Sequence, residues 1–138
     1  MDSRGNRDAG EVSPEFEKRD PRYLRYFELF REEKFFEAHE VLEALWRETK
    51  GAKRDFYQGL IQLAAALVHY QKGNLTGAKE LFKTASRYLE PYGRIEEGVR
   101  LDPILKEYTQ FLEIWSRHPD KPELARTFLP RVGLYRYP

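Results

Sequence analysis

Three side chains that could do acid–base or metal chemistry stand close together in one short stretch. His39 and Glu40 are adjacent, and Glu43 follows His39 by four residues. In a helix, positions four apart lie on one face, so His39 and Glu43 could reach the same ion or ligand. Glu40 would then be placed as a general base. Trp46 extends this row by one further turn and adds a single N–H donor.

The surrounding stretch is typical of an amphipathic helix. Its apolar stripe consists of Phe35, Ala38, Val41, Leu42 and Leu45. His39, Glu43 and Trp46 lie along one edge of this stripe, where burial is partial and polar atoms need partners. The pattern predicts a site at this edge without naming a reaction.

A second polar stripe interrupts the next expected helix, residues 53–72. That helix is apolar almost all round, which indicates burial in the middle of a bundle. The exceptions fall within roughly 60° on a helical wheel and are Gln58, Gln62, Ala65 and His69. The short link between the two helices predicts antiparallel packing, which places this stripe opposite His39 and Glu43.

Three interpretations of the combined cluster stay open. The first is a buried network in which Glu43 accepts from His39 and Gln62 bridges them. The second is a polar pocket that binds a small ligand or a protein partner. The buried network and the polar pocket would use the same residues, which are Glu37, His39, Glu40, Glu43, Trp46, Gln58, Gln62 and His69.

The third interpretation is a metal site. His39-Glu40-x-x-Glu43 is similar to the H-E-x-x-H helix of zinc-dependent hydrolases, with Glu in place of the second His. The ligands of a divalent metal such as zinc would be His39, Glu43 and His69. Because such a pattern also arises by chance in a Glu-rich helix, binding without a cofactor is the favoured function. A metal-dependent hydrolase is the alternative, and whether the protein is an enzyme stays open.

Composition limits the class of protein. The chain has 138 residues, enough for one domain, and 41% of them are hydrophobic. Its 24 Lys and Arg against 23 Asp and Glu argue against a dedicated nucleic-acid binder. The absence of cysteine excludes disulfides and thiolate metal sites. The longest apolar run, 59–70, is too short for a membrane span, and 1–17 carries no signal-peptide core, so we expect a cytoplasmic protein.

Helix start and stop signals predict an all-α bundle of about five helices, arranged as antiparallel hairpins. Asp20-Pro21 and Asp102-Pro103 are start signals, and Gly51 and Gly73 are stop signals. The predicted helices are 21–33, 35–50, 53–72, 74–90 and 102–117, with a loop at 92–101 and a short turn at 124–128. We therefore expect a flexible arm at 1–19, a bundle domain at 20–118 and a tail at 119–138.

These residues together resemble a known family. The similarity rests on the segments 36–43 and 58–66, on Trp46 and His69, and on the glycines of Gly73-Asn74 and Gly77-Ala78. It extends from about Tyr23 to Leu89, and the family is the bacterial and archaeal domain-of-unknown-function family 309. The resemblance implies a compact all-helical domain with no established activity. The signature positions that it implies are Glu37, His39, Glu40, Glu43, Trp46, Gln62 and His69.

Overall fold

The structure, a computed structural model, describes residues 19–93 and 95–132, and it confirms the all-α prediction. Within these residues the elements are α2 (Pro21–Arg31), α3 (Phe35–Glu48), α4 (Lys53–Gln71), α5 (Leu75–Leu89), the 3-10 helix η2 (Glu90–Tyr92), β1 (Ile95–Glu96), β2 (Val99–Arg100), α6 (Leu101–Arg117) and the 3-10 helix η3 (Pro122–Phe128). The expected arm at 1–19, apart from Arg19, and the tail residues 133–138 lie outside the described residues.

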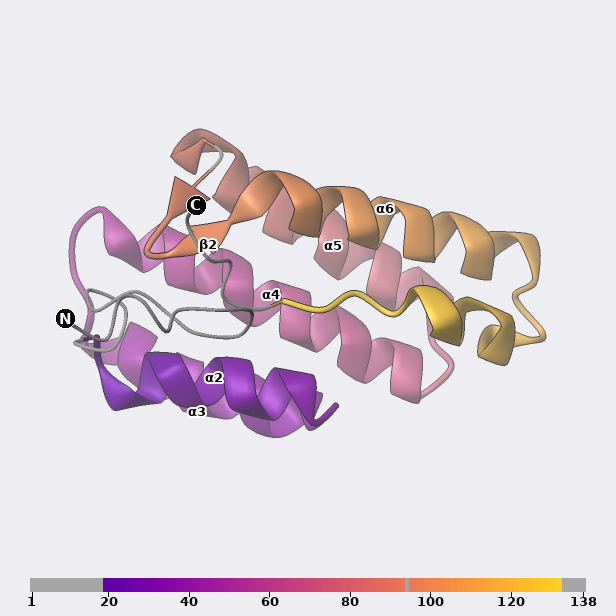
Figure 1. The fold of residues 1–138 in the computed structure, drawn as a ribbon, viewed down its shortest axis with the longest axis horizontal. Helices are drawn as coiled ribbons and strands as arrows, with labels where there is room; N and C mark the ends of the chain where they lie inside the picture. Colours follow the sequence, from indigo (N-terminus) through magenta and orange to yellow (C-terminus); the bar gives the residue numbers. More distant parts are fainter. Residues whose placement is uncertain (1–18, 94, 133–138) are drawn as a thin grey trace, which may run out of the picture.

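The helices form two layers (Figure 1). α3, α4 and α5 pack side by side in one layer, with α4 in the middle. α2 packs on α3, and α6 lies over α5 in the second layer. Because the links between α2 and α3 and between α4 and α5 are short, these helices form the predicted antiparallel hairpins.

Several helix ends form as the sequence predicts. The Asp20 carboxylate accepts a hydrogen bond from the backbone N–H of Arg22 at 2.8 Å, and the Asn74 side-chain oxygen accepts from Gly77 N–H at 2.9 Å. Gly51 and Gly73 follow α3 and α4 with φ of 85° and 72°, a left-handed conformation that favours glycine.

The start of α6 differs from the prediction. Asp102 does not cap this helix, because α6 already begins at Leu101, directly after β2. Pro103 is tolerated in the first turn, where a backbone N–H has no intrahelical partner. The expected loop before it contains a two-residue hairpin in which Ile95 pairs with Arg100 and Glu96 with Val99. The turn residues Glu97 and Gly98 have φ of 51° and 78°, as a type I′ turn requires.

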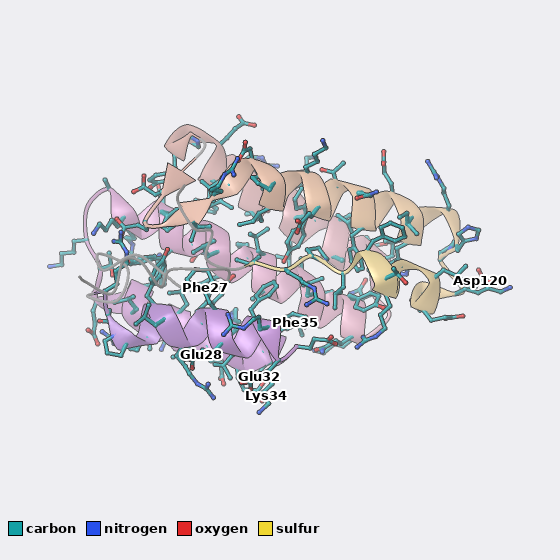
Figure 2. The ribbon with its side chains drawn as sticks, viewed as in Figure 1. Phe27, Glu28, Glu32, Lys34, Phe35 and Asp120 are labelled. Carbon is teal, nitrogen blue, oxygen red and sulfur yellow. The ribbon has the colours of Figure 1, made fainter. Side chains whose placement is uncertain are left out.

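α4 lies at the centre of the core, and both helices of the other layer, α2 and α6, contact it. The Tyr26 hydroxyl of α2 donates to the Leu60 carbonyl at 2.6 Å, and the Tyr108 hydroxyl of α6 donates to the Leu63 carbonyl at 2.7 Å. Both tyrosines are almost wholly buried. Figure 2 shows Phe27 and Phe35 directed into the molecule, whereas the charged Glu28, Glu32 and Lys34 lie at its rim.

Part of the segment predicted as a tail packs on the bundle. η3 lies against α6, and the side chains of Ala125 and Val132 are fully buried. The Tyr70 hydroxyl donates to the Pro122 carbonyl at 3.2 Å, and Arg126 pairs with Glu33 at 2.8 Å. No helix in the described part of the chain is both long enough and apolar enough to cross a membrane.

Candidate functional site

The predicted site residues of α3 lie outside the side that faces the core. The core side of α3 carries Ala38 and Leu42, both fully buried. Glu37 is exposed and lies within about 20° of Glu48, which pairs with Arg22 of α2 at 3.0 Å. Glu37 therefore lies on the α2 side of the helix, away from His39, Glu43 and Trp46.

Trp46, near the C-terminal end of α3, is in direct contact with Arg54 of α4. The Arg54 guanidinium carbon lies 4.0 Å from the centre of the Trp46 indole. Arg54 also donates to the backbone carbonyls of Trp46 and Thr49, at 3.1 and 3.0 Å. The Arg54 side chain thus holds the end of α3 against the start of α4.

His39 faces α4 two turns further along. Trp46 of α3 contacts Arg54 of α4, and the two helices run antiparallel. His39 lies about two turns before Trp46, and Gln62 lies about two turns after Arg54, so His39 and Gln62 face each other, as predicted. The His39 ring stacks on the Phe36 ring with centres 6.0 Å apart and planes 23° apart. Phe36 is 53% exposed, the highest fraction among the large hydrophobic side chains in the described residues.

The hydrogen bonds expected between His39, Glu43 and Gln62 do not form. His39 Nδ1 and Gln62 Oε1 are both buried and have no hydrogen-bond partner among the described residues. Glu43 instead pairs with Arg47 at 3.1 Å, because a residue one turn later on the same helix is within easy reach. Gln58 is half-buried one turn before Gln62, and Glu40 is exposed one turn after Phe36.

These residues form one surface, which we call the α3–α4 seam. It consists of Phe36, His39, Glu40, Glu43 and Trp46 of α3 and Gln58 and Gln62 of α4. The seam brings together most of the predicted site residues and also includes Phe36, and Arg54 packs on its Trp46 end. The sequence analysis did not identify the roles of Phe36 and Arg54. The sequence did contain a signal for an exposed Phe36, because this large hydrophobic residue lies outside the apolar stripe of α3.

His69 belongs to a different part of the molecule. It follows Gln62 by seven residues, roughly 10 Å along α4. Its Nδ1 lies 3.0 Å from Asn74 Nδ2. Because Asn74 Oδ1 accepts from Gly77 N–H, Nδ2 is the donor and His69 Nδ1 accepts. His69 therefore supports the corner between α4 and α5.

The three-ligand metal set does not assemble. His69 lies at this corner, away from His39, and Glu43 pairs with Arg47. Within 19–93 and 95–132, no group of three His, Cys, Asp or Glu side chains is placed to hold a metal ion.

Two hollows in the described surface lie away from the expected pocket. One, of about 360 Å³, is lined by Asp55, Thr84, Arg87, Tyr88, Pro91 and Tyr92. The other, of about 450 Å³, is lined by Lys79, Phe82, Thr109, Leu112, Glu113, Ser116 and Arg117. The first lies between α4, α5 and η2, and the second between α5 and α6. Neither includes a residue of the α3–α4 seam.

Comparison with known proteins finds similarity over the part of the chain that includes α3 and α4. Residues 23–81 match the family described as "Domain of unknown function (DUF309)", which confirms the resemblance seen in the sequence. The matched segment contains the α3–α4 seam and His69. The "Uncharacterized protein YpuF" of Bacillus subtilis (strain 168) is 41% identical over 81 residues, which are 58% of this chain and 45% of that protein. The chain thus matches less than half the length of that relative. No solved structure matches the chain significantly.

Proposed function

We propose that this domain is a non-catalytic binding module and that a protein partner docks on the α3–α4 seam. The observation that carries this proposal is the pair of buried, unpartnered atoms, His39 Nδ1 and Gln62 Oε1. A buried polar group without a hydrogen bond costs on the order of 1–3 kcal/mol, so packing alone favours apolar side chains at both positions. Residues that cost stability in this way are typical of functional surfaces.

The exposed ring beside these atoms supports the same proposal. Phe36 covers His39 while leaving more than half of its own surface in contact with solvent. Aromatic side chains are enriched among the residues that contribute most to protein interfaces. An aromatic ring next to half-buried polar groups therefore suits an interface with a protein.

A protein partner fits the seam better than a small substrate. The two hollows described above lie elsewhere on the molecule, Glu40 is exposed on the outer side of α3, and Glu43 is half-buried beside Arg47. A broad contact on the surface requires no enclosed pocket. The hydrolase alternative has less support, because it requires a third ligand near His39 and His69 is not there.

The test combines crosslinking with a matched pair of variants. The photoreactive residue p-benzoylphenylalanine replaces Glu40 on the seam or Glu113 on α6, in the full chain and in cells that naturally express it. We expect a crosslinked protein from position 40 and none from position 113. The purified partner should then bind the Phe36→Ala variant at least about tenfold more weakly than the unmodified chain.

Phe128→Ala is the control, because Phe128 is 41% exposed and lies on η3, outside the seam. It should leave the dissociation constant unchanged. Equal weakening by the two variants, or a partner crosslinked only from position 113, would overturn the proposal.

A further inference from the structure

The two sides of the α3–α4 pair differ in what covers them. On the inner side α2 packs on α3, and its Tyr26 hydroxyl reaches the Leu60 carbonyl of α4. On the outer side no described element covers Phe36 or Glu40. Because a helix already complements this pair on one side, a helix is a suitable shape to complement it on the other.

The spacing of the seam residues defines the length of such a helix. Phe36, His39, Glu43 and Trp46 recur every three or four residues over two to three turns. They extend about 15 Å along α3. A partner helix of about three turns, with apolar residues at i, i+3 or i+4 and i+7, matches this length.

The charges of the seam define the polar face of the partner. Glu40 is exposed and forms no ion pair with a described residue, and Glu43 is only partly neutralised by Arg47, itself 66% exposed. Arg54, the nearest cation of α4, is engaged by Trp46 and two carbonyls. The rim of the seam therefore carries one carboxylate without an ion pair to a described residue, that of Glu40, beside the Glu43–Arg47 pair.

This charge also argues against a second copy of the chain as the occupant. A two-fold axis close to Glu40 would bring the Glu40 carboxylates of both copies together, and like charges across an interface are unfavourable. Lys or Arg side chains would instead complement the rim and increase the rate of association.

We infer that the occupant of the α3–α4 seam is a cationic amphipathic helix of a partner protein. Its apolar residues contact Phe36 and Trp46, and its basic residues lie beside Glu40 and Glu43. The inference rests on the proposed function and specifies the chemistry of the partner.

The probes for the test are two synthetic amphipathic peptides of about 18 residues, long enough to form a helix. One carries leucine and lysine, and the other carries leucine and glutamate in the same pattern. Binding to the full chain is measured by titration calorimetry and mapped by amide chemical shifts. The leucine–lysine peptide should bind at least about tenfold more tightly, weaken with salt and shift the α3 and outer α4 signals.

Charge-reversal variants make the test specific. Glu40→Lys with Glu43→Lys should reverse the preference between the two peptides, and the milder Glu40→Gln with Glu43→Gln should abolish it. Glu80→Lys with Glu113→Lys is the control on α5 and α6 and should change nothing. Both control residues are exposed.

Three outcomes would overturn the inference. They are equal binding of both peptides, shifts confined to the hollow between α5 and α6, and dimerisation of the chain through the seam. If the glutamate peptide binds the seam more tightly, the charge assignment fails while the proposed function stands. If neither peptide shifts the seam and position 40 yields no crosslink, the proposed function fails as well.

Discussion

At the scale of single residues, close contacts surround Gly77, a glycine at the corner between α4 and α5. A Cβ atom on Gly77 would lie 2.7 Å from His69 Nδ1 and 2.6 Å from Asn74 Nδ2. Alanine normally stabilises a helix by about 1 kcal/mol relative to glycine. Here it must displace the His69 ring and the Asn74 cap, so we expect Gly77→Ala to destabilise the protein by about 1–2 kcal/mol.

Urea unfolding would measure this effect, with His69→Ala as the background that separates its causes. In that background Gly77→Ala should cost less, because one of the two obstructing groups is gone. A Gly77→Ala variant more stable than the unmodified chain would show that the corner is not closely packed.

At the same corner, the sequence predicts which residues share a helix face but not which side chains bond to each other. Helical periodicity places Gln58, Gln62 and His69 on one stripe, and that part of the prediction depends only on 3.6 residues per turn. It cannot show that His69 bonds to Asn74, because this contact depends on how the chain turns after Gly73. Nor does periodicity give the rotamers that leave His39 Nδ1 and Gln62 Oε1 without partners.

At the scale of the elements, Arg54 holds the end of α3 against the start of α4. Its planar guanidinium stacks on Trp46 and donates to two carbonyls, which a lysine ammonium cannot do in the same geometry. Arg54→Lys should therefore lower the free energy of unfolding by about 1 kcal/mol. Arg47→Lys is the matched control on the exposed side of α3 and should be nearly neutral. Equal thermal midpoints for both variants would contradict the role of Arg54.

Two tyrosine hydroxyls that bond to α4 make the stability of the bundle sensitive to alkaline pH. Burial raises the pKa of Tyr26 and of Tyr108 well above the ordinary tyrosine value. In the unfolded chain these phenols ionise near pH 10, whereas in the folded protein they stay neutral to higher pH. Their contribution to stability is therefore complete below about pH 10 and is lost as the pH rises above it.

Unfolding measured from pH 8 to 11 would test this sign. Tyr26→Phe and Tyr108→Phe should each cost about 1 kcal/mol at pH 8, where a hydrogen bond is lost. Each should also make the decline above pH 10 shallower, because phenylalanine does not ionise. Tyr88→Phe, at a half-buried position on α5, is the control. A decline as steep in Tyr26→Phe and Tyr108→Phe as in the unmodified chain would contradict the prediction.

At the scale of the whole molecule, local signals predict the helices better than they predict what joins them. Asp20, Gly51, Gly73 and Asn74 act at the helix ends as their residue types indicate. The β1–β2 hairpin has two residues in each strand, too few for an alternating pattern to be visible in the sequence. The packing of η3 depends on contacts between residues far apart in the chain, such as Tyr70 with Pro122.

Truncation after His118 tests whether the domain ends where the sequence signals suggest. The removed segment includes the buried Ala125, Pro130 and Val132, and the Pro122 carbonyl that accepts from Tyr70. Tyr70 in turn packs edge-on against Trp115, with ring centres 5.1 Å apart, and Trp115 is almost wholly buried. Since tolerance of truncation depends on the burial and hydrogen bonding that are lost, we expect a lower urea midpoint and a red shift of the tryptophan emission. Val132→Ala should lower the midpoint less, because it leaves η3 in place. A truncated chain with the midpoint and emission of the full chain would make 20–118 the cooperative unit and η3 an accessory to it.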